Sequence, residues 1–166
     1  MKMRLKASLG VAVAAGALLV GATSPASASV HMDFVFIQSG HDAYGLYNNY
    51  NSYELRSTLT QKPTSPSINT WSIISVAPDT GYPNVVIRNS ATNRCMRAMS
   101  SSSVQMKSCN SSDPNEIWAM TNSPVGTQFF NFAVRSCLDE GNGGSPYLFH
   151  EEGCNSGNPY QGWILR

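Results

Sequence analysis

Three tryptophans recur along the chain at nearly constant spacing, and this repetition limits the architecture more than any other feature of the sequence. Trp71, Trp118 and Trp163 are 47 and 45 residues apart, and the chain has no other tryptophan. Each is followed two positions later by an aliphatic residue and preceded two positions earlier by a side chain that can form hydrogen bonds. These flanking residues are Ile73, Met120 and Leu165 on one side, and Asn69, Glu116 and Gln161 on the other. Alternation with a period of two is typical of a strand with one buried face. The sequence therefore predicts three copies of a unit of about 46 residues, with the tryptophans in a shared core.

Each copy contains four short segments that suit strands, separated by turns rich in Gly, Asn, Ser and Pro. The predicted strands are 34–38, 44–48, 53–58 and 69–75 in the first copy, 84–89, 95–98, 103–107 and 116–120 in the second, and 128–132, 136–139, 146–150 and 161–165 in the third. Short, regularly spaced strands indicate a closed all-β fold with few exposed edges. No window has the sustained apolar stripe of a helix, so little helix is expected.

Four cysteines lie in the second half of the chain, at positions 95, 109, 137 and 154. An even number in an exported chain indicates disulfides, and four cysteines allow three pairings. Cys109 and Cys154 each lie nine residues before a tryptophan. This matched spacing favours the local pairing Cys95–Cys109 and Cys137–Cys154. A zinc site is the alternative, but the spacing is not that of paired C-x-x-C motifs.

The first residues are typical of a signal peptide. A head with two lysines and one arginine precedes an apolar run at 9–20, and Ala-Ser-Ala at 26–28 resembles a cleavage site. The run is too short and wrongly flanked for a membrane-spanning helix. We therefore expect residues 1–28 to be a signal peptide and residues 29–166, 138 residues in all, to be one secreted domain.

The charge of the chain disfavours two classes of partner. Three of the eleven Lys and Arg residues lie in the first six positions, so the exported chain carries eight basic and ten acidic residues. It has no basic patch, no run of like charges and no second long apolar stretch. Nucleic acid is therefore not an expected partner, and no membrane insertion is expected.

Several segments resemble the repeat of ricin B-type lectins. In the second copy these are Asn89-Ser-Ala-Thr-Asn-Arg-Cys-Met, Val104 to Cys109, and Glu116-x-Trp118. In the third copy they are Ser136 to Asp139, Cys154, and Gln161-Gly-Trp163. The resemblance implies a β-trefoil, in which three four-stranded repeats surround a pseudo-threefold axis. The repeats would span about 34–82, 83–124 and 125–166 within the domain 29–166.

A narrower resemblance concerns the first repeat. The stretch Glu54-Leu-Arg-Ser-Thr-Leu-Thr, then Thr70-Trp-Ser-Ile-Ile and Asn84-Val-Val-Ile-Arg-Asn, is similar to the lectin-like A and C subunits of cytolethal distending toxins. This resemblance implies a cell-surface-binding role in a secreted toxin, with another toxin subunit as partner.

The ricin-type resemblance also implies where a sugar would bind. Such a site needs an acid just after the first cysteine, an aromatic plate on the third strand and an amide before the tryptophan. In the third repeat these positions hold Asp139, His150 and Gln161, with Tyr160 as a further ring able to stack. The longer loop at 151–153 leaves the register of His150 open. Each residue also has a structural interpretation: Asp139 caps a turn, Gln161 supports the fold, and His150 lies in a solvated loop.

The other two repeats depart from this pattern. In the middle repeat Arg97 stands at the acid position and Lys107 at the plate position, although Asn115 keeps the amide. The first repeat offers Arg56 at the plate position, with Tyr47 nearby, and has no matching acid. The two cations of the middle repeat favour a protein ligand or an anionic glycan over a neutral galactoside. The tyrosines and asparagines between Tyr44 and Tyr53 fit either a binding loop or ordinary turns.

Nothing in the sequence favours catalysis. The three histidines at 31, 41 and 150 show no metal-ligand spacing, and the chain has neither a G-x-S-x-G elbow nor a glycine loop for phosphate. We expect no enzyme, metal or cofactor. Two function classes remain: carbohydrate recognition, alone or as the cell-binding subunit of a toxin, and a protein-binding trefoil with vestigial sugar pockets, such as an inhibitor. The expected partner is a glycan or glycoprotein.

Overall fold

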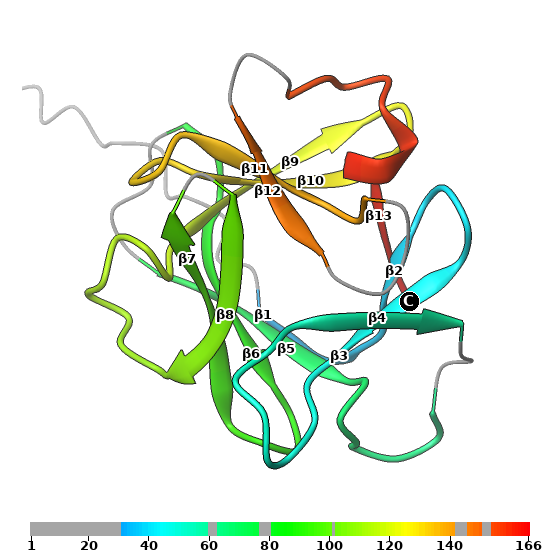
Figure 1. Ribbon diagram of the computed structural model, residues 1–166, viewed down its shortest axis with the longest axis vertical. Helices are drawn as coiled ribbons and strands as arrows, with labels where there is room; N and C mark the ends of the chain where they lie inside the picture. Colours follow the sequence, from blue (N-terminus) through cyan, green and yellow to red (C-terminus); the bar gives the residue numbers. More distant parts are fainter. Residues whose placement is uncertain (1–30, 60–62, 77–80, 101, 142–145, 151–153) are drawn as a thin grey trace, which may run out of the picture.

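The computed structural model describes residues 31–59, 63–76, 81–100, 102–141, 146–150 and 154–166. The predicted signal peptide at 1–28 and the loop at 151–153 lie outside the described residues. Within them the chain forms strands and one short 3-10 helix, arranged around a central axis in Figure 1. The predicted all-β class is confirmed. Among these residues there is no helix with the length and apolar character that crossing a membrane requires.

The thirteen strands of the described part follow the repeat order. Their bounds are β1 His31–Val35, β2 Ile37–Ser39, β3 Tyr44–Tyr47, β4 Arg56–Leu59, β5 Trp71–Ser75, β6 Asn84–Asn89, β7 Arg94–Ser100, β8 Ser103–Ser108, β9 Trp118–Ser123, β10 Gly126–Asn131, β11 Ser136–Asp139, β12 Tyr147–His150 and β13 Trp163–Leu165. The 3-10 helix η2 spans Pro159–Gln161.

Strands from all three repeats pair antiparallel into a ring. β5 pairs with β1 and β6, β9 pairs with β6 and β10, and β13 pairs with β10 and β2. Only Phe36 separates β1 from β2, and its backbone exchanges hydrogen bonds of 2.9 and 3.1 Å with that of Arg166. The last residues of the chain therefore close the ring against the first strands, which removes exposed edges.

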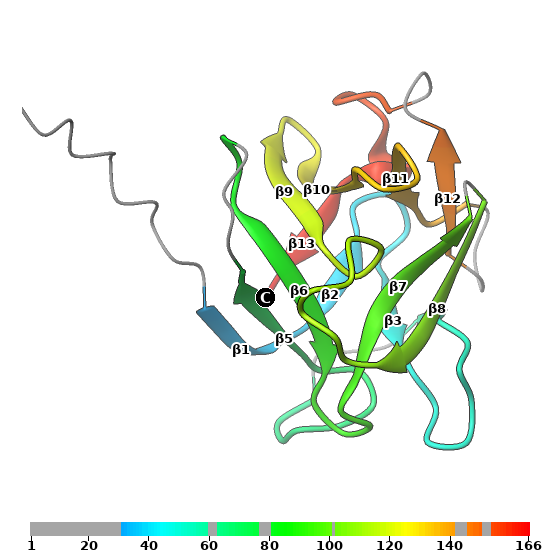
Figure 2. The ribbon, with the colours of Figure 1, turned by 90° about the vertical axis from the view of Figure 1, so that its left-hand side faces the viewer.

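Each repeat also contributes one hairpin outside this ring. The hairpins are β3–β4, β7–β8 and β11–β12, and they lie around the centre of the view in Figure 1. Figure 2 shows β7, β8 and β12 on the right, beside the ring strands β1, β5, β6 and β9. Three hairpins around a closed ring confirm the β-trefoil that the sequence predicted.

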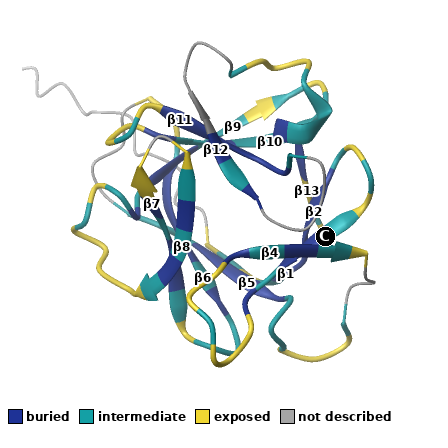
Figure 3. Cartoon of the chain, viewed as in Figure 1, coloured by how far each residue is buried: buried dark blue, intermediate teal, exposed yellow. Residues whose placement is uncertain are grey.

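The three tryptophans are fully buried in one core. All three have no exposed surface, and they pack in one hydrophobic cluster with aliphatic side chains from every repeat. Each indole Nε1 also donates a hydrogen bond to a backbone carbonyl: Trp71 to Leu46 at 3.2 Å, Trp118 to Met96 at 3.0 Å and Trp163 to Leu138 at 3.2 Å. Exposed residues, yellow in Figure 3, lie mainly in loops and turns.

A second set of backbone hydrogen bonds fixes which residues of the repeats correspond. The N–H groups of Asn48, Ala98 and Glu140 donate to the carbonyls of Ile68, Asn115 and Tyr160, at 3.0, 2.9 and 2.9 Å. Tyr47, Arg97 and Asp139, one residue earlier, therefore occupy equivalent positions. Arg97 and Asp139, assigned from the sequence to the acid position of the second and third repeats, thus correspond, and Tyr47 takes this position in the first repeat.

Both disulfides have the local pairing that the spacing favoured. Cys95 is bonded to Cys109 and Cys137 to Cys154. Each joins the first strand of a hairpin to the loop that follows the hairpin's second strand. Such bridges constrain the unfolded chain.

The structure differs from the predicted strands where polar side chains turn inward. β9 and β13 begin at the tryptophans rather than two residues earlier. Glu116 Oε2 accepts the Asn110 N–H at 2.7 Å, and Gln161 Oε1 accepts the Asn155 N–H at 2.8 Å. Because these buried side chains satisfy loop backbone groups, the residues before each tryptophan form turns instead of strand.

Candidate functional site

Asp139, the predicted acid of the third repeat, is engaged inside the fold. It is 2% exposed, and its Oδ1 accepts the Gly141 N–H at 2.7 Å. Its cross-strand neighbour is Tyr147. Burial raises the pKa of the Tyr147 phenol, and the charge and hydrogen bond of Asp139 raise that pKa further. Asp139 therefore caps the turn after β11 and interacts with Tyr147.

Tyr160 and Gln161 are neighbours in η2 that differ in burial. Gln161 is fully buried and supports the loop at Asn155. Tyr160 is half-buried, and its ring stacks on His41 with centroids 3.9 Å apart and planes 24° apart. The stacking partner of Tyr160 is thus a side chain of the first repeat.

His150 occupies a different register position from the one predicted. It is the last residue of β12, opposite Ser136, and its side chain lies outside the described residues. Phe149 stands opposite Cys137, as Lys107 stands opposite Cys95. The register therefore places Phe149 at the plate position of the third repeat, and in the sequence four residues lie between Phe149 and Cys154 but only one between Lys107 and Cys109.

The same correction applies to the first repeat. Thr58 stands opposite Gly45, whereas Arg56 stands opposite Tyr47. Since Gly45 corresponds to Cys95, the plate position there is Thr58 rather than Arg56. The first repeat has no cysteine from which to count, which is why the sequence placed this position two residues too early.

A buried carboxyl group lies beside Asp139. Glu140 is fully buried, and its Oε1 accepts a hydrogen bond from the Ser57 hydroxyl at 3.0 Å. Burial raises the pKa of Glu140 to about 7, and the nearby charges of Asp42 and Asp139 raise it as well. Within the described ranges no three His, Cys, Asp or Glu side chains are arranged to hold a metal ion.

The middle repeat, in contrast, carries an open hollow. It has a volume of about 430 Å³ and is lined by Tyr53, Arg97, Lys107, Ser108, Asn110, Asp113 and Glu116. Arg97 and Lys107 are the two cations that stand in the middle repeat at the expected positions of the acid and of the aromatic plate. Side chains from β7, from β8 and from the loop after β8 therefore converge here with a tyrosine of the first repeat.

Tyr53 places an aromatic ring in this hollow. Its carbonyl accepts the Met106 N–H at 2.7 Å, which fixes the first-repeat loop beside β8. Its side chain is 55% exposed. Lys107 Nζ lies 5.0 Å from the ring centroid, and Arg94 Cζ lies 4.4 Å from it. Of the stretch between Tyr44 and Tyr53, the structure thus assigns Tyr53 to the hollow.

Asp113 supplies a carboxylate to the same hollow. Arg97 Nε donates to its Oδ2 at 2.7 Å, and the Asn115 N–H donates to its Oδ1 at 3.0 Å. The hydrogen bond from Arg97, followed by the one from Asn115, lowers the pKa of Asp113, so the group is ionised. The sequence left Tyr53 open as part of a binding loop or a turn, and it missed Asp113, because neither lies at a repeat position expected to contact a sugar.

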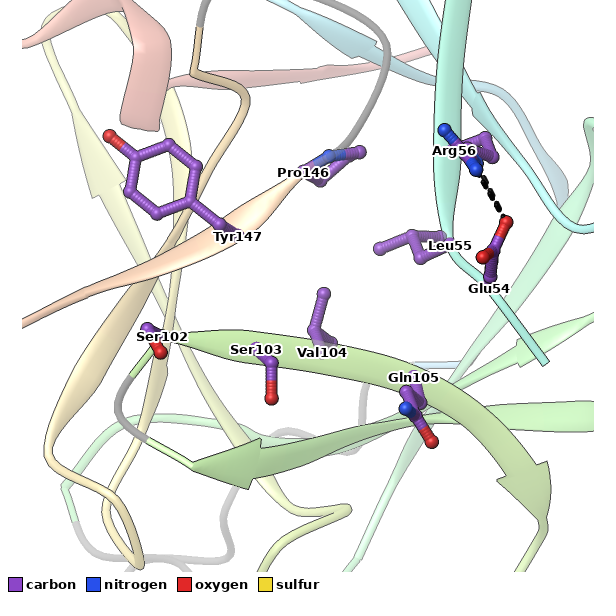
Figure 4. A pocket seen from close by; sticks show the side chains of 9 residues that line it. All are labelled: Glu54, Leu55, Arg56, Ser102, Ser103, Val104, Gln105, Pro146 and Tyr147. Atoms are coloured by element: carbon purple, nitrogen blue, oxygen red, sulfur yellow. Dashed lines mark hydrogen bonds and ion pairs between the residues drawn. The ribbon is translucent and has the colours of Figure 1, made fainter.

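A second hollow of about 280 Å³ lies between the three hairpins, shown in Figure 4. Leu55 and Val104 point into it, and Pro146 of the third repeat completes an apolar lining. Ser103 and Gln105 point away from it in Figure 4. The Glu54–Arg56 ion pair, 2.6 Å long, lies at one side. Because few polar groups converge there, this hollow suits a sugar less well than the middle-repeat hollow.

Comparison with known proteins gives one family and many similar folds. Residues 80–163 match the model of the ricin-type β-trefoil lectin domain. No curated protein matches the chain. Among solved structures, a GlcNAcα1-4Gal-releasing endo-β-galactosidase from Clostridium perfringens is 12% identical with a TM-score of 0.63, over 79% of this chain and 31% of that chain. This chain thus spans about a third of the clostridial enzyme.

Two smaller proteins match over most of their length. The designed threefold-symmetric protein ThreeFoil is 15% identical with a TM-score of 0.61, over 80% of this chain and 98% of that chain. SeviL bound to asialo-GM1 saccharide is 16% identical with a TM-score of 0.61, over 80% of this chain and 94% of that chain. At these identities the three structures show a shared fold.

Proposed function

Because the chain belongs to the family of ricin-type β-trefoil lectin domains, we propose that it is a carbohydrate-binding module that takes a glycan in the hollow of its middle repeat. The observation that supports this site is the convergence of Tyr53, Asp113, Asn110 and Lys107 on one open hollow. An exposed ring can stack on the apolar face of a sugar, while the polar groups select hydroxyl positions. A similar fold, SeviL, is bound to asialo-GM1 saccharide.

The polar groups of the hollow can both accept and donate hydrogen bonds. Each oxygen of Asp113 already accepts one hydrogen bond, and a carboxylate oxygen can accept a second one from a sugar hydroxyl. The ammonium of Lys107 offers three donors. Because hydrogen bonds from Arg97 and Asn115 already hold the Asp113 side chain, ordering this side chain on binding would cost little entropy.

Binding without cleavage is the proposed activity. Glycoside hydrolysis needs two carboxyl groups that flank the scissile bond. Two carboxyl groups line the hollow, and Asp113 is paired with Arg97. Glu116 is 1% exposed, and its Oε2 accepts a hydrogen bond from the Asn110 N–H. The activity of the clostridial enzyme belongs to a protein about three times as long as the matched part.

The third repeat stays a predicted second site, formed by Asp139, His150, Tyr160 and Gln161, although Phe149 rather than His150 stands opposite Cys137. An alternative function, a protein-binding trefoil with vestigial sugar pockets, draws support from the engagement of Asp139 and Gln161 inside the fold. A role as the cell-surface-binding subunit of a secreted toxin is a narrower proposal, supported by the first-repeat resemblance. Secretion itself is supported by the apparent signal peptide and by two disulfides, which suit an oxidising compartment.

A glycan array, followed by titration of the best ligand, tests the proposal. Tyr53→Ala should weaken binding by about tenfold, since a stacked ring contributes on the order of 1 kcal/mol beyond buried area. Tyr82→Ala is the matched control, because Tyr82 is also an exposed tyrosine, at 52%, and does not line the hollow. If Asp139→Ala abolished glycan binding and Tyr53→Ala left it unchanged, the binding site would lie in the third repeat. Absence of glycan binding, with a secreted protein co-purifying, would favour the protein-binding trefoil.

A further inference from the structure

Two cations beside the middle-repeat hollow have no carboxylate partner in the described part of the chain. Lys107 and Arg94 both contact the Tyr53 ring, and Arg94 also donates to the Ser52 carbonyl. The ion pairs of the described residues involve neither of them. Their positive charges are therefore uncompensated next to an exposed aromatic ring.

The negative charges of the same hollow are already compensated. Asp113 is paired with Arg97, whose side chain lines the hollow and is 28% exposed. Glu116 is buried, and its Oε2 accepts the Asn110 N–H. Burial also raises the pKa of Glu116, which reduces its tendency to carry charge. Because Asp113 is paired and Glu116 is buried, the charge that this hollow presents to a ligand is mainly that of Lys107, with Arg94 beside it.

We infer that the glycan bound in this hollow carries a negative charge, a carboxylate or a sulfate, which Lys107 and Arg94 hold beside the Tyr53 ring. The inference rests on the proposed carbohydrate-binding function and narrows its ligand class. Lysine provides a mobile point charge, while the planar guanidinium of arginine can donate two parallel hydrogen bonds to an oxyanion. Tyr53 keeps the sugar ring against the hollow while these groups hold the charged substituent.

The position of these cations on two adjacent strands supports the inference. Lys107 belongs to β8, and Arg94 stands opposite Ser108 in the β7–β8 ladder, so the two side chains approach Tyr53 from neighbouring strands. The hydrogen bond from Arg94 to Ser52 holds the first-repeat loop to this hairpin. The charged groups and the ring therefore form one preorganised surface, which lowers the cost of binding.

Matched pairs of glycans that differ only in charge provide the test. Sialylated and sulfated oligosaccharides are each compared with the same oligosaccharide lacking the acidic group, by titration calorimetry at several salt concentrations. The wild-type protein should bind the charged member at least about fivefold more tightly, since a partly exposed ion pair contributes on the order of 1 kcal/mol. Added salt should reduce this preference by screening. The sialylated and sulfated pairs distinguish carboxylate from sulfate.

Lys107→Gln should abolish most of the preference for charge, because it should weaken binding of the charged member far more than binding of the uncharged member. Arg135→Gln is the control, because it removes one positive charge from an exposed turn outside the hollow. Equal thermal midpoints of the two variants would exclude unfolding as the cause. Equal affinity of the wild-type protein for both members of every pair would overturn the inference and leave carbohydrate binding intact. Failure of every glycan to bind would overturn both.

Discussion

Each tryptophan combines a large buried volume with one hydrogen bond to a backbone carbonyl. Trp118 has no exposed surface, and its indole donates to Met96. Trp118→Ala should lower the free energy of unfolding by about 3–5 kcal/mol, because the cavity cannot close fully. Trp118→Phe should cost less, since it retains most of the volume and mainly leaves the Met96 carbonyl without its donor, about 1–3 kcal/mol. Urea denaturation measures both variants, and an unchanged midpoint for Trp118→Ala would contradict the core assignment.

Glu140 makes stability depend on pH. Its pKa in the folded protein is about 7, above the ordinary value of 4.5. Between these values the folded state holds a proton that the unfolded state has released, so the free energy of unfolding falls as pH rises through this range. The slope for one proton is at most about 1.4 kcal/mol per pH unit. Glu140→Gln should flatten the dependence between pH 4.5 and 7, as measured by urea midpoints across that range. Parallel pH profiles of the free energy of unfolding for Glu140→Gln and the wild type would contradict the assignment of this pH dependence to Glu140.

At the residue scale the sequence could identify the core but not the hollow. Trp71, Trp118 and Trp163 are recognisable because they recur in phase with aliphatic residues. Tyr53 and Asp113 have no such signal. Both line the hollow because the Tyr53 carbonyl accepts the N–H of Met106 in β8, and Arg97 Nε donates to Asp113 in the loop after β8. Contacts between loops and hairpins depend on tertiary geometry, which a periodic pattern does not encode.

At the scale of elements, the disulfides should differ in their effect on binding. Each closes a loop of similar length, with sequence separations of 14 and 17, so loss of either should cost about 2–4 kcal/mol of stability. Cys109, however, lies between Ser108 and Asn110, which line the middle-repeat hollow. The double variant Cys95→Ala/Cys109→Ala should therefore also weaken glycan binding.

The double variant Cys137→Ala/Cys154→Ala is the control for this prediction, because that bridge lies in the third repeat. Calorimetric titration at a temperature where both variants are folded measures the difference. Equal loss of affinity in the two variants would show that the first bridge does not organise the hollow.

Strand bounds were predictable where turn residues such as Gly, Asn, Ser and Pro flank a short segment. The predicted 84–89 and 136–139 match β6 and β11 at both ends, and 103–107 matches β8 to within one residue. The first predicted strand is instead divided at Phe36, after Phe34 adopts a φ of 59°. A left-handed residue and the register shift before Val35 mark a bulge. The pattern of residues does not show this bulge, because it depends on how the strand meets both β5 and β13.

At the scale of the molecule, the closed ring joins the three repeats into one cooperative unit. In a linear repeat array each unit contacts only its neighbours, and unfolding can proceed unit by unit. Here the third repeat returns to the first, since β13 pairs with β2 and the Phe36 backbone is bonded to that of Arg166. All three tryptophans also share one core. Loss of one repeat would therefore expose the core surfaces and strand edges of the other two.

The oxidised protein should consequently unfold in a single transition. Urea curves followed by tryptophan fluorescence and by far-ultraviolet circular dichroism should coincide, as expected for a two-state domain of this size. Trp71→Phe and Trp163→Phe, which lie in different repeats, should shift the whole curve to lower urea without adding a second step. A variant lacking Trp163 to Arg166 should fail to fold in all three repeats, because β10 and β2 would each lose one partner strand and the ring would open. Separate transitions for the two probes, or a folded remainder in the shortened chain, would show that the repeats are stable independently and that ring closure does not determine cooperativity.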